Sequence, residues 1–216
     1  MALAYQNLAM VAQFRRDARA TREWAEALRA LALKEGFQMW LPASALMRGW
    51  ALSAAGAHAE GIAEMRGALD QWQMTGAALV VPYYLSMLAE ALTACGEAGE
   101  ALRLLEDALA ASRASGEAWW RAEVLRQKGT VLRLRDNLEA AEDCLREAIA
   151  VARSQEAKSL ELRAMCSLAP VLAARGRRAE ARAGILQAQE WFREGFDSAD
   201  WQDSARLLAS LSAAGG

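Results

Sequence analysis

Residues that end helices recur in this sequence every 40 residues. Glycines stand at positions 36, 76 and 116, and a second series of breaks falls at Gly56, Gly96, Asp136 and Gly176. Glycine readily adopts the left-handed backbone conformation that closes helices, so each series marks helix ends. The runs between the breaks, such as 80–92 and 98–109, carry apolar residues at helical spacing. A fixed period of this length predicts stacked pairs of helices.

Small side chains recur at the positions where two paired helices must approach closely. One column holds Ala9, Gly49, Ala89, Gly129 and Ala169, a second Thr21, Gly61, Ala101, Ala141 and Ala181, and a third Leu28, Ala68, Ala108, Ala148 and Ala188. A column of large apolar residues lies between the last two and comprises Met65, Leu105, Leu145 and Ile185. This small-large-small order is that of the tetratricopeptide repeat (TPR), in which Ala or Gly lets helix A pack on helix B. A HEAT-type repeat, the alternative at this period, does not predict these columns.

The chain divides into about five repeats plus a C-terminal segment. The repeats cover roughly 1–36, 37–76, 77–116, 117–156 and 157–196, so that residues 1–196 form one TPR-like array. The usual TPR period is about 34 residues, which leaves about six extra residues before each helix A. The A helices can then run to about 17 residues. We therefore predict an all-α, TPR-like helical-hairpin solenoid.

The C-terminal segment is predicted to close the array. Trp191 is expected to pack within helix B of the last repeat, and Gly195 is expected to end that helix. Asp197 or Ser198 can then cap a new helix that runs to about Leu211. Residues 197–216 are thus predicted to be a capping helix and tail, because a solenoid needs a terminal element that covers its last repeat.

Charge and composition exclude several classes of partner. The chain has 25 basic and 27 acidic residues, so no basic field for nucleic acid or for a membrane surface is expected. It contains no stretch of 18 apolar residues. The three cysteines lie far from any C-x-x-C spacing, which points to reduced thiols and a cytoplasmic location.

The sequence offers no pattern typical of catalysis, cofactor binding or metal binding. Lys128-Gly129-Thr130 has the wrong residue order for a phosphate-binding loop and lacks the upstream glycine. His58 is the only histidine, so a multi-histidine metal site is excluded. We therefore expect a protein that is not an enzyme and that carries no cofactor.

Several stretches resemble one group of bacterial proteins. These are Gly49-Trp50-Ala51-Leu52, Pro82-Tyr83-Tyr84-Leu85, Gln155-Glu156-Ala157-Lys158-Ser159-Leu160-Glu161 and Trp191-Phe192-Arg193-Glu194-Gly195. They are similar to the C-terminal TPR region of large proteins that join an adenylate/guanylate cyclase domain, or a transcription-factor domain, to a STAND/AAA-type ATPase. The resemblance implies a regulatory, protein-interacting module, and it brings no cyclase or ATPase chemistry because neither domain is present here.

TPR arrays bind ligands mainly on the concave face, which the A helices line. The repeat register places eight candidate contact residues there: Trp50, Tyr83, Glu90, Trp119, Glu123, Arg126, Arg133 and Arg163. Tyr, Trp and Arg are the side chains that most often dominate interfaces. The three arginines could bind a peptide carboxylate or an acidic side chain through paired N–H donors. In the alternative interpretation, the two glutamates neutralise these arginines across repeats.

Two functions are consistent with these features. The first is a non-catalytic signalling module that binds a peptide or partner domain in its groove. The second is a ligand-sensing or self-association module coupled to a cyclase or ATPase output domain. The second function draws on the N-terminal end, where Leu3, Leu8 and Val11 have no preceding repeat to cover them. This uncapped face could form a homodimer, and the chain looks cut from something longer.

Overall fold

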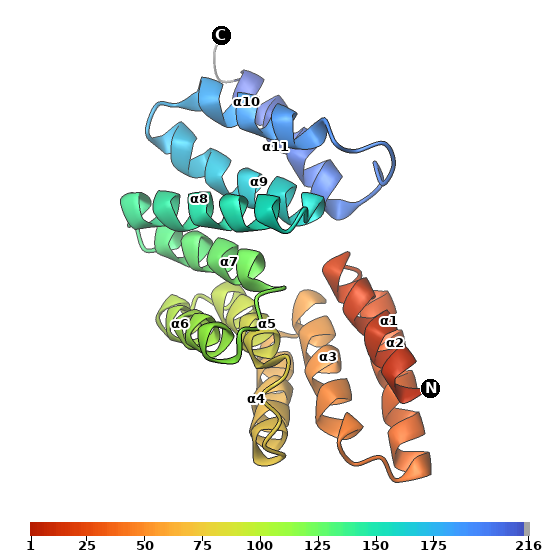
Figure 1. The fold of residues 1–216 in the computed structure, drawn as a ribbon. Coiled ribbons are helices and arrows are strands. Elements are labelled where there is room, and N and C mark those ends of the chain that lie inside the picture. Colours follow the sequence, from red (N-terminus) through yellow and green to blue (C-terminus); the bar gives the residue numbers. More distant parts are fainter. Residues whose placement is uncertain (214–216) are drawn as a thin grey trace. The chain divides into compact units, whose positions relative to one another are not determined.

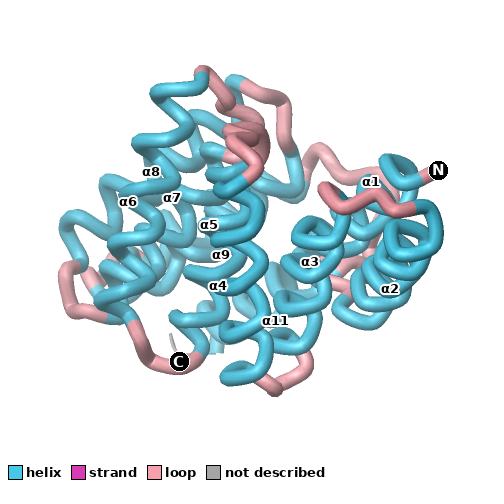
Figure 2. Tube along the Cα trace, turned by 90° about the horizontal axis from the view of Figure 1, so that it is seen from below, coloured by secondary structure: helices cyan, strands magenta, loops and turns pink. Residues whose placement is uncertain are grey.

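The computed structural model describes residues 1–213 and shows helices joined by short loops (Figures 1 and 2). The described residues form eleven helices and no strand: α1 (Ala2–Phe14), α2 (Ala18–Glu35), α3 (Trp40–Ala54), α4 (His58–Met74), α5 (Val81–Ala94), α6 (Ala98–Ser115), α7 (Arg121–Leu134), α8 (Leu138–Ser154), α9 (Lys158–Ala174), α10 (Arg178–Gln189) and α11 (Ala199–Ala213). Odd-numbered helices up to α9 are the A helices of the repeats, and even-numbered helices are the B helices. The last three residues of the predicted tail lie outside the described residues.

The helices fall into two compact units. Unit 1 is Met1–Leu104, and unit 2 begins at Leu105, within α6. In unit 1 the A helices α1 and α3 each contact their own B helix and the next A helix, through the contacts α1–α2, α3–α4, α1–α3 and α3–α5. Unit 2 repeats this arrangement with α7–α8, α9–α10 and α7–α9, and α11 packs on α9 and α10. The predicted all-α, TPR-like fold with a C-terminal capping helix is confirmed.

The turns between helices use left-handed backbone conformations at intervals of about 20 residues. Positive φ angles occur at Gly36, Gly56, Gly76, Gly96, Gly116, Gly176 and Gly195. Arg16, Asp136 and Glu156 also have positive φ angles and complete the two series. Left-handed backbone costs a residue with a Cβ roughly 1–2 kcal/mol. The breaks predicted from glycine and Asp136 are confirmed, whereas those at Arg16 and Glu156 carry no glycine signal.

The paired helices contact each other at the repeat positions that carry small side chains. Ala101, Ala141 and Ala148 have no exposed surface, as predicted. A Cβ added to Gly61 in α4 would collide with the carbonyl oxygen of Gly49 in α3 and would lie 2.8 Å from the Ser53 backbone nitrogen. Backbone atoms cannot move aside as a flexible side chain can. The glycines therefore set the distance between the two helices.

The end of the last repeat differs from the sequence prediction. α10 ends at Gln189, six residues before Gly195. Trp191 lies beyond the helix with 63% of its surface exposed, so its predicted packing role within helix B is wrong. The segment after α10 is instead anchored by aromatic contacts, since the Phe196 ring meets Trp201 of α11 with 4.8 Å between ring centroids. These contacts replace the helical hydrogen bonds that a longer α10 would have formed.

Candidate functional site

The predicted groove residues of unit 1 are buried between A helices. Trp50 donates its Nε1 hydrogen to Oε2 of Glu90 at 2.8 Å, and the Tyr83 hydroxyl donates to Oε1 of Gln13 at 3.0 Å. Tyr83 has no exposed surface, and Trp50 is also buried. Burial raises the pKa of Tyr83 well above its ordinary value, with smaller contributions from Tyr84 and Glu90, so the hydroxyl remains a donor. Trp50 and Tyr83 therefore cross-link α1, α3 and α5 instead of lining an open wall.

Three predicted residues of unit 2 belong to a buried ion-pair network. Arg126 donates Nε and Nη2 hydrogens to the two oxygens of Glu123 at 2.9 and 2.7 Å. Arg163 donates in the same paired manner to Asp200, at 2.9 and 2.7 Å. Its Nη1 atom also lies 3.4 Å from Oε1 of Glu123. The network joins α7, α9 and α11, and the Arg163 side chain is 9% exposed.

The charges of this network keep Glu123 ionised. Burial alone would raise the pKa of Glu123, but the positive charges of Arg126 and Arg163 and their hydrogen bonds outweigh it and lower the pKa to about 2. The ionised carboxylate therefore pairs with both arginines at neutral pH, and Asp200 supplies the second acidic partner of Arg163. This arrangement is the one expected if the glutamates pair with the arginines across repeats. Glu90, in contrast, binds the indole of Trp50.

Trp119 and Arg133 retain surface that a partner can reach. Trp119 is 39% exposed and donates its Nε1 hydrogen to Glu117 at 2.6 Å, while the neighbouring Trp120 is buried. Arg133 is half-buried in the last turn of α7. Over residues 1–213 its guanidinium has no hydrogen bond or ion pair. Arg126 is also partly exposed and donates an Nη1 hydrogen to Ser167 at 3.2 Å.

Sequence reasoning missed Asp200, the partner of Arg163. Asp200 lies in the first turn of α11, 37 residues after Arg163. The capping helix is not a repeat, so the period of 40 residues does not predict which of its side chains face α9. The one available signal was an acidic residue in the first turn of the predicted capping helix, where a carboxylate is favoured by the helix dipole.

In the part of the chain that the structure describes, no group of three or more His, Cys, Asp or Glu residues is arranged to hold a metal ion. Within the same residues, none of the helices is both long enough and apolar enough to cross a membrane.

Comparisons with known proteins agree with the helical hairpins. The tetratricopeptide repeat family matches residues 82–154, which run from the start of α5 to the end of α8. An uncharacterized protein of Rhizobium meliloti (strain 1021) is 32% identical over 127 residues, or 58% of this chain. The chain spans only 12% of that protein's length.

Solved structures with the same arrangement share little sequence with this chain. BtubC of P. vanneervenii has a TM-score of 0.66 at 16% identity, over 93% of this chain and 89% of its own. The TPR-like repeats of a Podosopora anserina protein assigned as a kinesin light chain have a TM-score of 0.61 at 20% identity, over 86% of this chain and 92% of their own. A Rap protein complexed with Competence and Sporulation Factor has a TM-score of 0.66 at 12% identity, over 99% of this chain and 65% of its own. The fold is TPR-like. The expected association with cyclase and ATPase domains stays a prediction.

Proposed function

We propose that this chain is a non-catalytic protein-interaction module that binds an acidic peptide or partner segment along the A-helix side of its repeats. The TPR-like fold supports an interaction role, and the Rap protein that shares it was solved with Competence and Sporulation Factor bound. The observation that carries the proposal is Arg133, a partly exposed guanidinium without a partner in the described residues. We place the module in the cytoplasm, because its cysteines are expected to be reduced.

The accessible part of the predicted site runs from the turn before α7 to the last turn of α7. Arg126 and Arg133 lie seven residues apart on α7, which is about two helical turns, and Trp119 lies two residues before this helix begins. The stretch from Trp119 to Arg133 therefore spans about 20 Å. An extended peptide of six residues spans about 20 Å and can reach both ends. In this arrangement the indole packs on an apolar side chain, and Arg133 binds a carboxylate through paired N–H donors.

The remaining predicted residues have a supporting role in this proposal. Glu123 and Arg163 keep the A helices of unit 2 in register, and Trp50, Tyr83 and Glu90 do the same in unit 1. Their substitution would disturb the fold before it revealed any effect on binding. Arg133 is the position at which binding and folding can be separated.

The test is calorimetric titration of acidic hexapeptides that carry a free C-terminal carboxylate. We expect Arg133→Ala to weaken binding by about 1.5–3 kcal/mol, because a charge-assisted hydrogen-bond pair is lost. Arg133→Lys should also lose affinity, since the charge remains but the planar pair of donors does not. Arg113→Ala, an exposed arginine on α6, is the matched control and should bind as the wild type does. Equal affinity of the wild type and both Arg133 variants would remove this residue from the site.

The second candidate function is self-association coupled to an output domain, such as the cyclase or ATPase that the resemblance implies. The observation that favours it is the outward face of α1, where Leu3, Leu8 and Val11 are 60%, 41% and 52% exposed. Exposed apolar side chains on one helix face are typical of an interface. Sedimentation equilibrium of the wild type and Leu8→Glu tests this function. A concentration-independent monomer mass for the wild type would reject it.

A further inference from the structure

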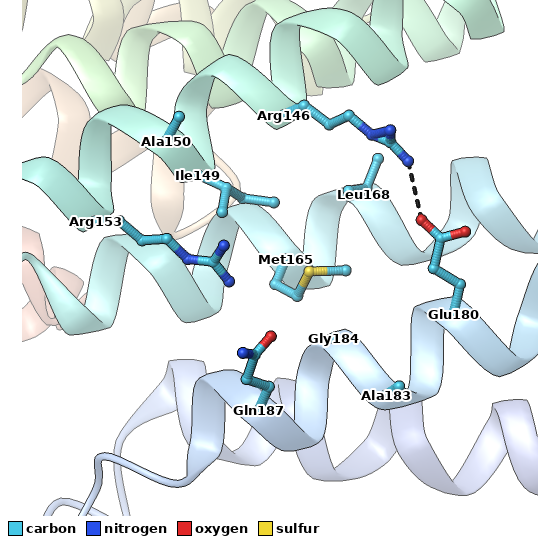
Figure 3. A pocket seen from close by; sticks show the side chains of 10 residues that line it. All are labelled: Arg146, Ile149, Ala150, Arg153, Met165, Leu168, Glu180, Ala183, Gly184 and Gln187. Carbon is cyan, nitrogen blue, oxygen red and sulfur yellow. Dashed lines mark hydrogen bonds and ion pairs between the residues drawn. The ribbon is translucent and has the colours of Figure 1, made fainter.

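A pocket of about 820 Å³ lies in unit 2 between the B helices α8 and α10 (Figure 3). Its floor is apolar and consists mainly of Met165 and Leu168 of α9, both buried. Its walls include the small residues Ala150 of α8 and Ala183 and Gly184 of α10. Each wall presents residues spaced three, four and seven apart, which is one face of two helical turns. The pocket is thus a short groove between two helices, on the B-helix side of the repeats.

The groove arises where the last repeat departs from the others. At the position of Gly184, the earlier repeats have Trp24, Glu64, Leu104 and Cys144. In the first repeat, Trp24 stacks on Tyr5 of the paired helix with 5.9 Å between ring centroids. Gly184 lacks a side chain, and Met165 packs against it, since a Cβ there would lie 2.6 Å from Cε of Met165. This wall therefore carries no side chain at the position where the earlier repeats have one, and Met165 of the floor remains accessible from the groove.

The two ends of the groove differ in their polar groups. At one end, Arg146 of α8 and Glu180 of α10 form an ion pair of 2.9 Å across the groove. At the other end, Arg153 and Gln187 point toward the groove from opposite walls (Figure 3). Arg153 uses its Nε atom to bind Glu161 at 2.6 Å. Gln187 is exposed, and its side-chain amide has no hydrogen-bond partner within residues 1–213. This second end therefore has N–H donors to offer.

The charged residues that line the groove carry one excess positive charge, with Arg146 and Arg153 against Glu180. The ion pairs that these residues belong to join five cations to three carboxylates: Arg146, Arg153, Lys158, Arg175 and Arg177 with Glu142, Glu161 and Glu180. Beside the open end, Lys158 lies 4.0 Å from the ring centroid of the exposed Trp191. An apolar floor, an exposed tryptophan and surplus cations together favour an acidic, amphipathic partner.

We propose that this groove binds an amphipathic α-helix of a partner protein, with an acidic residue beside its apolar face. Two helices whose facing residues are small leave room for a third helix to pack between them, as in other helix-in-groove complexes. Its apolar side chains contact Met165 and Leu168, and its carboxylate accepts hydrogen bonds from Arg153 and Gln187. The site is formed by B helices, so it goes beyond the peptide site proposed on the A-helix side.

The probe is a blocked, fluorescent, Ala-rich peptide of about 16 residues, long enough to form a helix. It carries two Leu residues four apart and a Glu three residues after the second Leu, and its binding is followed by fluorescence anisotropy. A second peptide has Lys in place of this Glu and should bind about tenfold more weakly or less, because the charge-assisted hydrogen bonds are lost. Gln187→Glu should weaken binding of the Glu peptide, and Gln187→Lys should strengthen it. Gln187 belongs to none of the ion pairs of the described residues, so neither substitution removes a partner from one of them.

Ala183→Phe fills the groove from its wall and should abolish binding. Ala63→Phe is the matched control, because Ala63 is the equivalent exposed residue of an earlier repeat and should leave binding unchanged. Thermal melts followed by circular dichroism show that each variant is folded. Arg133→Ala should also leave binding of the Glu peptide unchanged. A negative result for the groove can therefore be told apart from a negative result for the peptide site proposed on α7.

Three results would overturn the proposal: no saturable binding of the Glu peptide, equal binding of the Glu and Lys peptides, or equal binding to wild type and Ala183→Phe. Decanoate serves as a further probe, since it combines an apolar chain with a carboxylate. If decanoate binds saturably and the Glu peptide does not, the ligand of the groove is a small amphiphile and the proposed partner helix is rejected.

Discussion

Replacing Asp200 with alanine tests the ion-pair network that joins α11 to the repeats of unit 2. The substitution removes the carboxylate that accepts two hydrogen bonds from Arg163. The Arg163 side chain is only 9% exposed, so water cannot readily replace the lost oxygens. Glu123 is a second acidic contact of Arg163, at 3.4 Å, and its oxygens already bind Arg126.

The cost follows from this geometry. Removing one partner of a buried ion pair destabilises a protein by about 3–5 kcal/mol, because the other charge is left without compensation. The nearby carboxylate of Glu123 offsets part of the loss, so we expect about 3 kcal/mol for Asp200→Ala. Asp200→Asn keeps one neutral acceptor and should cost about half as much. A domain of ordinary stability, about 5–15 kcal/mol, would still fold with either substitution.

Urea unfolding followed by circular dichroism gives the free energy, and hydrogen exchange of α11 shows where the loss occurs. Exchange should accelerate most in α11, because its link to α9 is removed. Glu23→Ala is the control, since Glu23 forms an exposed pair with Arg19 on α2 and should unfold as the wild type does. An Asp200→Ala variant with wild-type stability and unchanged α11 exchange would refute the reasoning.

Three further predictions concern backbone packing, turn strain and pH. Gly61→Ala should destabilise the protein by about 1–3 kcal/mol, because its Cβ meets the backbone of Ser53, whereas Gly67→Ala in the same helix should be neutral or stabilising; thermal melts compare the two. Glu156→Gly should stabilise by up to about 1 kcal/mol in urea titrations, because Glu156 has a φ angle of 54°, and a loss of stability would contradict this strain. The pKa of Glu123 is lowered from 4.5 to about 2, so its stabilisation is complete above pH 4.5 and is lost as the pH falls toward 2. This contribution is about 3 kcal/mol, and the free energy of unfolding should therefore fall more steeply below pH 4.5 in the wild type than in Glu123→Gln.

The fold could be predicted because its signal repeats. Small residues at Gly61, Ala101 and Ala141 are required wherever two helices cross closely, and the turn at Asp136 fits a series that glycines define elsewhere. The end of α10 was predicted six residues too late. Gly195 does have a left-handed conformation, but aromatic contacts of the segment after α10 hold the chain in turns there instead of in a helix.

The candidate site was harder to predict. The repeat register indicates which side of a helix a residue lies on, but it does not say whether a neighbouring helix covers it. Tyr83 was placed on the correct row of helices and is nevertheless fully buried, because Gln13 of α1 reaches its hydroxyl. The repeat register predicts that Arg163 binds a carboxylate of a partner, but Asp200 of α11 supplies that carboxylate within the chain. Both outcomes depend on side chains far away in the sequence.

No motif and no repeat column in the sequence indicates the groove on the B-helix side. It depends on the absence of a side chain at Gly184, which is visible only when the five repeats are compared at that position. Gln187 offers a similar signal, because the two preceding repeats have Glu147 and Asp107 at its position.

Mapping of backbone amide chemical shifts tests the proposed function most directly. The measurement titrates the acidic hexapeptide of highest calorimetric affinity into the isotope-labelled protein. The proposed site predicts that the largest shift changes run from Trp119, just before α7, along α7 to Arg133, and that Arg133→Ala suppresses them. Shift changes confined to α8 and α10, or no changes at all, would contradict a binding site on the A-helix side.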